Sequence, residues 1–133
     1  MESYTIDTVA FLAYLIDALP SQSDEIFRKA ENDELMLILP SIVIGETIYT
    51  ILKKKRIFEN AIPLEKMSML FEIIRDIKTI NLVDMNLQCW KKLLTIEIPE
   101  LHDRMIVAIH LTYKSKAILT NDPEIKSVTN TIW

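Results

Sequence analysis

Apolar residues in this chain fall into two alternating patterns, short continuous runs and longer stretches with helical periodicity. The short runs predict buried strands at residues 4–6, 35–39, 79–83, 117–120 and 128–132. The periodic stretches predict helices at residues 8–19, 23–32, 42–54, 63–77, 84–95 and 102–114, with a turn or short helix from Pro123. Strands that alternate with helices are typical of a mostly parallel sheet covered by helices on both faces.

Several helix ends carry local signals. Pro20 is expected to close the first helix, and Ser23 and Asp84 are expected to cap the helices that follow them. Pro40 and Ser41 are expected to begin the helix at 42–54. The chain of 133 residues shows no internal repeat, low-complexity tract or linker. We therefore predict one α/β domain over residues 1–133.

Composition and charge limit the function classes. Half of the residues are hydrophobic and 26% are charged, which is ordinary for a globular protein. A net charge of −4 argues against a protein that coats nucleic acid by electrostatics alone. It leaves room for an enzyme that acts on RNA through bound cations, because a divalent metal reverses the field of a carboxylate cluster.

The location can also be predicted. Cys89 is the one cysteine and lies in a predicted helix, so we expect a half-buried structural residue and a reducing, cytoplasmic setting. The start, MESYTID, lacks the features of a signal peptide. The most apolar stretch, residues 35–52, is interrupted by Pro40, Gly45 and Glu46 and is not expected to span a membrane.

Four acidic residues stand out, although each has an ordinary structural explanation. Asp7 follows the first predicted strand and fits a helix N-cap, while Asp122 precedes a proline and fits a turn. Asp103 fits the first turn of a helix. Glu46 lies in an apolar helix, either at a solvent-facing rim or partly buried and paired, beside Gly45, which would allow another backbone to approach closely.

Together these acids suggest a metal site. Asp7 and Asp122 follow parallel strands and should meet at one edge of the sheet, where α/β proteins bind ligands. Glu46 and Asp103 lie on helices that could lean over that edge. Oxygen-only ligands suit Mg²⁺ or Mn²⁺, and one or two such ions could support in-line hydrolysis of a phosphodiester.

Four segments carry a family resemblance: YTIDTVAFLAYL, PSIVIGETIYTILKK, ELHDRMIVAIHL and AILTNDPEI, in this order along the chain. They resemble the PIN domain, and most closely the VapC-like toxins of toxin–antitoxin pairs. The family's four acids match Asp7, Glu46, Asp103 and Asp122. Its supporting positions match four neighbours of these acids: Thr8, Arg104, Thr120 and Asn121.

The resemblance implies a five-stranded parallel sheet and a Mg²⁺- or Mn²⁺-dependent endoribonuclease that forms a homodimer. For the toxin branch it also implies an antitoxin partner. Within this scheme we expect Asp7, Asp103 and Asp122 to hold the metal. We expect Glu46 to complete the coordination shell, either directly or through a water molecule. Arg104 could orient a carboxylate or hold a phosphate. Gly45 departs from the larger residue that is usual at this position in the family.

Other signals have alternative explanations. The basic run Lys53, Lys54, Lys55 and Arg56 could contact the RNA backbone or form a solvated helix end. We interpret two histidines, spaced unlike metal ligands, as structural, and two tryptophans as core or dimer contacts: His102, His110, Trp90 and Trp133.

Competing functions are distinguished by what the chain contains. A haloacid-dehalogenase-type phosphatase needs a second aspartate where Val9 stands, and a response-regulator receiver needs an acidic pair at the end of the first strand, where only Asp7 is present. A housekeeping RNA-processing nuclease and a non-catalytic PIN-like scaffold that binds RNA or protein remain as alternatives to a toxin. An upstream reading frame that encodes a DNA-binding antitoxin would favour the toxin.

Overall fold

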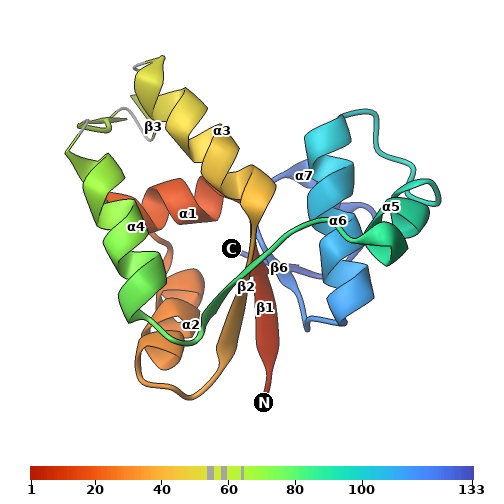
Figure 1. The fold of residues 1–133 in the computed structure, drawn as a ribbon, viewed down its shortest axis with the longest axis horizontal. Coiled ribbons are helices and arrows are strands. Elements are labelled where there is room, and N and C mark those ends of the chain that lie inside the picture. The colour runs from red at the N-terminus through yellow and green to blue at the C-terminus, as the bar shows by residue number, and fades with distance from the viewer. Residues whose placement is uncertain (54–55, 58–59, 64) are drawn as a thin grey trace.

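A five-stranded parallel sheet forms the centre of the protein (Figure 1). The computed structural model describes residues 1–53, 56–57, 60–63 and 65–133. In these residues the strand order is β5-β2-β1-β6-β7, and every neighbouring pair is parallel, as predicted. The strands of this sheet are β1 (Ser3–Ile6), β2 (Met36–Pro40), β5 (Ile80–Val83), β6 (Ile118–Leu119) and β7 (Thr131–Ile132).

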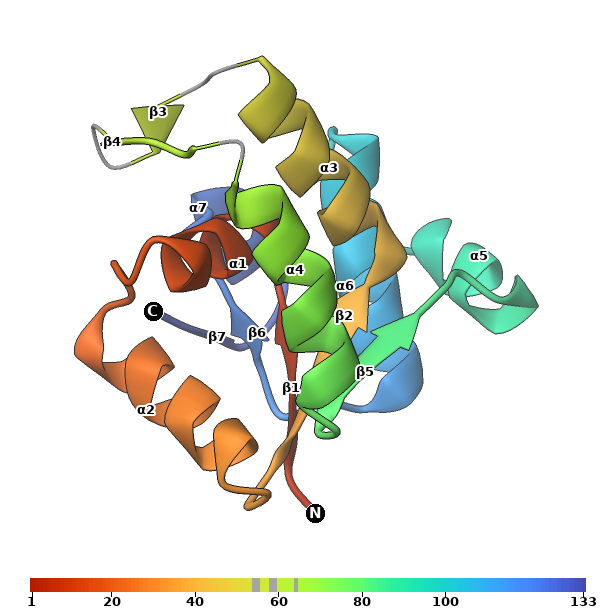
Figure 2. The ribbon, with the colours of Figure 1, turned by 60° about the vertical axis from the view of Figure 1, so that its left-hand side comes forward.

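Helices cover both faces of the sheet. Figures 1 and 2 show α2 and α4 on one side and α5 and α6 on the other, while α3 rises from the end of β2. The helices are α1 (Thr8–Leu15), α2 (Ser21–Glu31), α3 (Ser41–Leu52), α4 (Lys66–Asp76), α5 (Leu87–Leu93), α6 (Leu101–Tyr113) and α7 (Pro123–Lys126). The architecture is therefore the α/β arrangement that the alternating pattern predicts.

The core lies between the sheet and these helices. Its large side chains with under 2% exposure include Phe11, Phe27, Leu37 and Ile106. The rings of Tyr14 and Phe27 stack with centroids 4.4 Å apart, which joins α1 to α2. Because β2, β1 and β6 are covered by helices on both sides, successive residues along these strands are buried and burial does not alternate.

The first helix is shorter than predicted. It ends at Leu15, and Asp17 adopts a left-handed conformation with φ of 56°. The amide of Asp17 donates to the carbonyl of Tyr14, and the amide of Ala18 donates to that of Ala13. This is the Schellman arrangement, in which a residue with positive φ ends the helix. Aspartate here fills the place that glycine usually takes, so Pro20 is not the residue that ends the helix.

Two predicted helix caps are wrong. Helix α2 begins at Ser21 after Pro20, so Ser23 lies inside the helix, fully buried, and its hydroxyl has no hydrogen-bond partner among the described residues. Helix α5 is capped by Asn86, whose side chain accepts from the amide of Cys89 at 2.9 Å, and not by Asp84. Cys89 is completely buried, whereas we expected half burial.

The segment between α3 and α4 contains a feature that the sequence analysis missed. Strands β3 (Arg56–Ile57) and β4 (Asn60–Ala61) pair antiparallel as a small second sheet. Helix α3 ends at Leu52 and Lys53 is its C-cap, so the helix is shorter than the predicted range of 42–54. Lys54 and Lys55 lie outside the described residues. Among the described helices, none is long and apolar enough to cross a membrane.

Candidate metal centre

Asp7 occupies the junction between β1 and α1. Its carboxylate caps α1 by accepting a hydrogen bond from the amide of Thr8, and it accepts a second bond from the hydroxyl of Thr120. Strands β1 and β6 pair in a register that places Ile6 opposite Leu119, so Asp7 and Thr120 emerge side by side. Asp7 is only 6% exposed. Asp7 can therefore cap α1 and be a candidate metal ligand at the same time.

Asp122 is held at the same edge of the sheet. It caps the short helix α7, and its carboxylate accepts from the amide of Glu124 at 2.8 Å. The Thr120 hydroxyl accepts from the Asp122 amide at 3.0 Å while it donates to Asp7. Thr120 thus links the two aspartates through hydrogen bonds, and its supporting role in a functional site stays a prediction.

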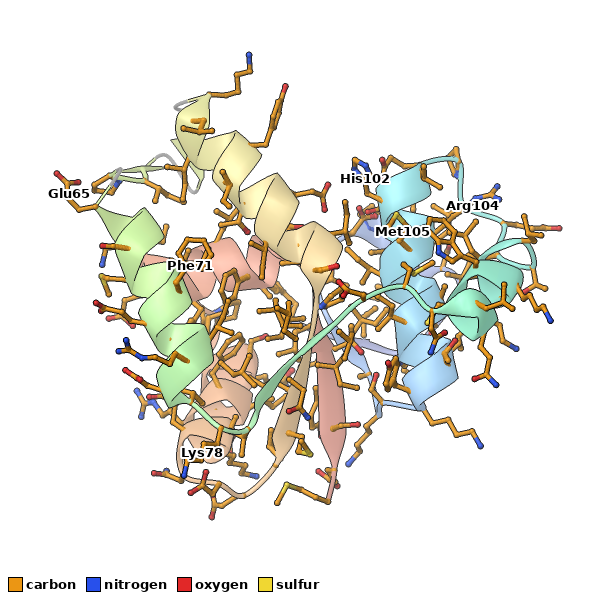
Figure 3. The ribbon with its side chains drawn as sticks, in the orientation of Figure 1. Glu65, Phe71, Lys78, His102, Arg104 and Met105 are labelled. Atoms are coloured by element: carbon orange, nitrogen blue, oxygen red, sulfur yellow. The ribbon has the colours of Figure 1, made fainter. Side chains whose placement is uncertain are left out.

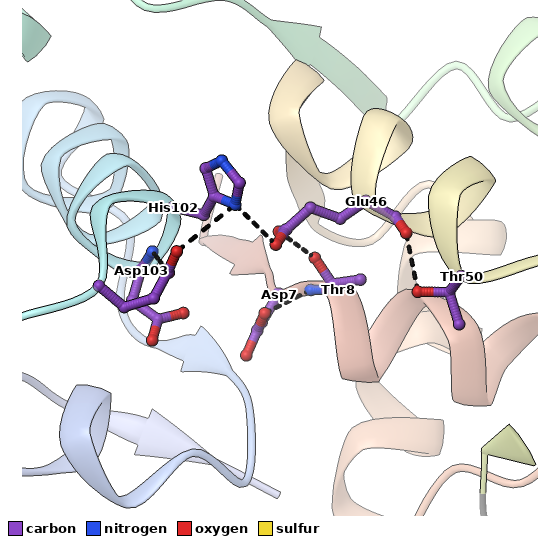
Figure 4. Close-up of polar contacts among 7 residues, drawn as sticks. Asp7, Thr8, Glu46, Thr50, His102 and Asp103 are labelled. Carbon is purple, nitrogen blue, oxygen red and sulfur yellow. Dashed lines mark hydrogen bonds and ion pairs between the residues drawn. The ribbon is translucent and has the colours of Figure 1, made fainter. Parts of the chain in front are cut away.

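Glu46 reaches the site from α3. One carboxylate oxygen accepts from the hydroxyl of Thr8 at 2.7 Å, and the other lies 3.1 Å from Nδ1 of His102 (Figure 4). The Glu46 side chain is 30% exposed, which corresponds to a partly buried and paired carboxylate. The sequence analysis left this pairing open.

His102 corrects the sequence analysis, which grouped both histidines as structural. His110 is indeed buried between the hydroxyls of Ser115 and Thr129. His102 instead lies at the start of α6 and contacts Glu46 across the interface of α3 and α6 (Figures 3 and 4). Its position directly before Asp103 was the available signal, because adjacent first-turn residues lie at the same end of a helix.

Asp103 lies in the first turn of α6. This helix is capped by Glu100, whose carboxylate accepts from the Asp103 amide at 2.8 Å. The Nε of Arg104 donates to the carbonyl of Ile98 in the loop before α6, and its role toward a carboxylate or a phosphate stays a prediction. Arg104 therefore anchors that loop.

The four predicted acids share one pocket. Its volume is about 410 Å³, and its lining includes all four carboxylates together with Thr8 and Asn121. One oxygen each of Asp103, Asp122 and Glu124 lie within 4.8 Å of one another. Glu124 was missed as a site candidate, since an acid in a helix first turn has an ordinary explanation.

The electrostatics of the pocket favour a cation. Burial raises the pKa of Asp7 to about 6, against the lowering effect of its bonds from Thr120 and Thr8, and Glu46 and Asp122 raise it further. Burial also raises the pKa of Asp103 to about 7, and the charges of Asp122 and Glu100 add to this increase. Desolvation is therefore the largest cause of both pKa increases, and the repulsion between like charges adds to it.

The donor set fits a hard divalent ion. All candidate ligands are oxygen atoms, which suits Mg²⁺ and Mn²⁺ and does not suit zinc in its usual sites. A cation would also remove the cost of ionising Asp7 and Asp103 in this pocket, because an opposite charge lowers a carboxyl pKa. Among the described residues, Asp103, Asp122 and Glu124 have oxygens close enough to share one such ion, and Asp7 and Glu46 line the same pocket.

Thr120→Val should weaken Mn²⁺ binding by about 10- to 100-fold, because hydrogen bonds that orient metal ligands typically have effects of this size. The substitution keeps the shape but removes the donor to Asp7 and the acceptor for the Asp122 amide. Isothermal titration calorimetry would measure the change. Thr95→Val is the matched control, since Thr95 bonds only to the Lys92 carbonyl among the contacts found, and equal losses in both variants would contradict the role of Thr120.

Gly45 does not have the role that we predicted. Among the described residues outside its own helical turn, no atom lies within 4 Å of a Cβ built at this position, so none of their backbones approaches closely. The glycine lies in α3 next to Glu46 and lines a second pocket beside the first. The glycine therefore leaves open space beside α3 and does not serve to let another segment pack closely against the helix.

A parallel α/β sheet with clustered carboxylates at its carboxyl edge defines a class of protein suited to divalent metal chemistry. Comparison with known protein families shows which family within this class the chain belongs to. The model of the PIN domain matches residues 4–130, so this chain belongs to the PIN domain family. Members of this family are typically nucleases that use divalent metals.

Solved structures support the same fold. VapBC2 of Rickettsia felis, bound to a DNA fragment from its promoter, is similar with a TM-score of 0.73 and 17% identity over 98% of both chains. A toxin–antitoxin complex of Klebsiella pneumoniae gives 0.69 and 9% identity, over 98% of this chain and 96% of the other. VapC20 of Mycobacterium tuberculosis, a toxin that cleaves the sarcin–ricin loop, gives 0.60 and 13% identity over 93% of both. No curated protein matches the sequence significantly.

Proposed function

We propose that this protein is a Mg²⁺- or Mn²⁺-dependent endoribonuclease and the toxin of a type II toxin–antitoxin pair. The observation that carries the proposal is the convergence of Asp7, Glu46, Asp103 and Asp122 on one pocket at the carboxyl edge of the sheet. The similar structures from Rickettsia and Klebsiella are of toxin–antitoxin systems, and the one from Mycobacterium is of an RNA-cleaving toxin. They support the toxin branch over a housekeeping nuclease.

The residues have separate tasks in this mechanism. Asp7, Asp103 and Asp122 would hold the metal, and the bound metal would supply Lewis acidity and lower the pKa of a water molecule. Thr120 orients two of these ligands through its two hydrogen bonds. Thr8 and His102 hold both oxygens of Glu46, so that its carboxylate faces the site and can keep a water molecule in place. Asp103, with a pKa of about 7, would release its proton when metal binds near neutral pH.

A surface for protein partners is part of the proposal. Helix α5 and the residue after it expose Leu87 (70%), Trp90 (45%) and Leu94 (80%). Exposed apolar groups that gather on one element are typical of protein–protein contacts. Trp90 is not a core residue, so of its two predicted roles the dimer contact remains. Trp133, by contrast, packs against the main core. We propose a homodimer and an antitoxin as partners of this chain.

Labelled single-stranded RNA should be cleaved in Mn²⁺ or Mg²⁺ and remain intact in EDTA. Because a metal-activated water attacks phosphorus, a 2′-deoxy nucleotide at the cleaved position should still permit cleavage. If the neighbouring 2′-hydroxyl were the nucleophile, the 2′-deoxy substitution would abolish cleavage. Cleavage that persists in EDTA, or that requires the 2′-hydroxyl, would contradict the mechanism.

The toxin role needs a cellular test. Expression of the chain should arrest growth, and co-expression of the protein encoded in the adjacent upstream reading frame should restore it. A housekeeping nuclease would neither arrest growth nor depend on such a neighbour. A cytoplasmic location remains a prediction from the sequence.

A further inference from the structure

A second pocket adjoins the carboxylate pocket. Its volume is about 390 Å³, within the range of about 300–1,000 Å³ that is usual for small-molecule sites. Thr8 and Glu46 line both pockets. A nucleotide next to a phosphodiester bound at the carboxylates would therefore reach this second space.

One face of α3 forms much of the lining. Ile42, Gly45 and Tyr49 line the pocket, and their spacing of three and four residues places them on the same side of the helix. A Cβ at Gly45 would meet nothing within 4 Å. The missing side chain therefore leaves open space in this face, and a larger residue at position 45 would project into the pocket.

No structural requirement explains the glycine. Gly45 is the only glycine of the chain, and it lies inside a helix, where glycine is less stable than alanine. Its φ is not positive, and no backbone in the described part of the chain outside its own helical turn comes within 4 Å of a Cβ at this position. The open pocket is the one feature of its surroundings that a side chain would remove.

The remaining walls suit a nucleobase. Tyr49 is 53% exposed, and the His102 side chain is 44% exposed. Unpaired RNA bases are bound by stacking on tyrosine and histidine rings. The ammonium of Lys53 lies 5.8 Å from the centroid of the Tyr49 ring, which places a positive charge near the pocket for an RNA phosphate.

We propose that this pocket is a subsite for one unpaired base of the RNA substrate, next to the scissile phosphodiester, and that Gly45 is the residue that admits the base. The inference rests on the proposed function for the identity of its ligand as RNA. It adds a specificity determinant that lies outside the carboxylate cluster. It also gives Lys53, the described side chain of the basic run, a place beside the bound strand.

Gly45→Leu should fill the pocket and weaken binding of a fluorescent single-stranded RNA about 10- to 100-fold, the range expected from loss of base stacking. Binding is measured by anisotropy in the full chain with the additional substitution Asp103→Asn, which prevents cleavage. Gly45→Ala should weaken binding less than leucine does. Both variants should melt about 2–5 °C higher than their parent, because glycine is removed from a helix.

A set of RNAs, each with one abasic nucleotide, makes the test specific. For one abasic position, the RNA should bind the parent as weakly as intact RNA binds Gly45→Leu. The same abasic RNA should bind Gly45→Leu no more weakly than intact RNA does. Mn²⁺ affinity in otherwise wild-type protein should be unchanged by Gly45→Leu.

Each outcome separates the two proposals. Metal-dependent cleavage with full RNA affinity in Gly45→Leu would overturn the subsite and leave the nuclease intact. Base-dependent binding that Gly45→Leu removes, without cleavage by the wild type, would overturn the nuclease and support the subsite. Equal sensitivity of the parent and Gly45→Leu to every abasic position would also overturn the subsite.

Discussion

Asp103→Asn should slow metal-dependent RNA cleavage by at least about a thousandfold. The substitution is nearly isosteric but removes a negative charge that faces Asp122, Asp7 and Glu46. A metal ligand contributes several kcal/mol of transition-state stabilisation, and each 1.36 kcal/mol corresponds to about tenfold in rate. The measurement is the single-turnover rate on labelled RNA at saturating Mn²⁺.

Asp84→Asn is the matched control for this experiment. Asp84 also follows a parallel strand at the carboxyl edge of the sheet, but its strand is β5, at the end of the sheet beyond β2. Asp84 is exposed and does not line the carboxylate pocket. Its substitution should leave the rate within about twofold. A loss of similar size in both variants would show that the rate depends on the overall negative charge of the protein and not on the carboxylate pocket.

Asp7→Asn should stabilise the metal-free protein at pH 8 by roughly 1–3 kcal/mol while abolishing cleavage. Burial raises the pKa of Asp7 from 3.8 to about 6, and each pH unit of such a shift corresponds to about 1.36 kcal/mol. The folded state binds more protons than the unfolded state between about pH 4 and pH 6. The free energy of unfolding of the wild type therefore falls as the pH rises through this window, and it has lost this contribution at pH 8.

Urea denaturation in EDTA at pH 4 and pH 8 would test this prediction. The advantage of Asp7→Asn should be present at pH 8 and nearly absent at pH 4, and saturating Mn²⁺ should favour the wild type again, because a ligand of the folded state stabilises it by mass action. An Asp7→Asn protein that is less stable than wild type at pH 8 would mean that the cap on α1 outweighs the cost of the buried charge.

The sequence was sufficient for features that depend on neighbouring residues or on strand order. The apolar runs predicted all five strands of the main sheet. The parallel order then brought Asp7 and Asp122 to the same edge, where the structure has them linked through Thr120. Glu46 and Asp103 were singled out on helices that could reach this edge, and they line the same pocket as the two aspartates.

Other features depend on tertiary packing, or on local conformations that differ little in free energy from their alternatives. Asp17 ends α1 in a left-handed conformation that its side chain tolerates but does not require. Asn86 and Asp84 are both good caps, and the structure uses only Asn86. The contact of His102 with Glu46 joins residues 56 positions apart, so no local pattern contained it. The open space at Gly45 likewise depends on what α3 packs against.

We propose that the carboxylates of Asp7, Asp103 and Asp122 hold a divalent cation, with Glu46 beside it. Anomalous diffraction at the manganese edge from crystals grown with Mn²⁺ tests it most directly. We expect an ion in the carboxylate pocket within about 2.0–2.3 Å of oxygens from Asp103 and Asp122 and from Asp7 or a water that it holds. An empty carboxylate pocket at saturating Mn²⁺, or manganese bound only at other acids on the surface, would contradict it.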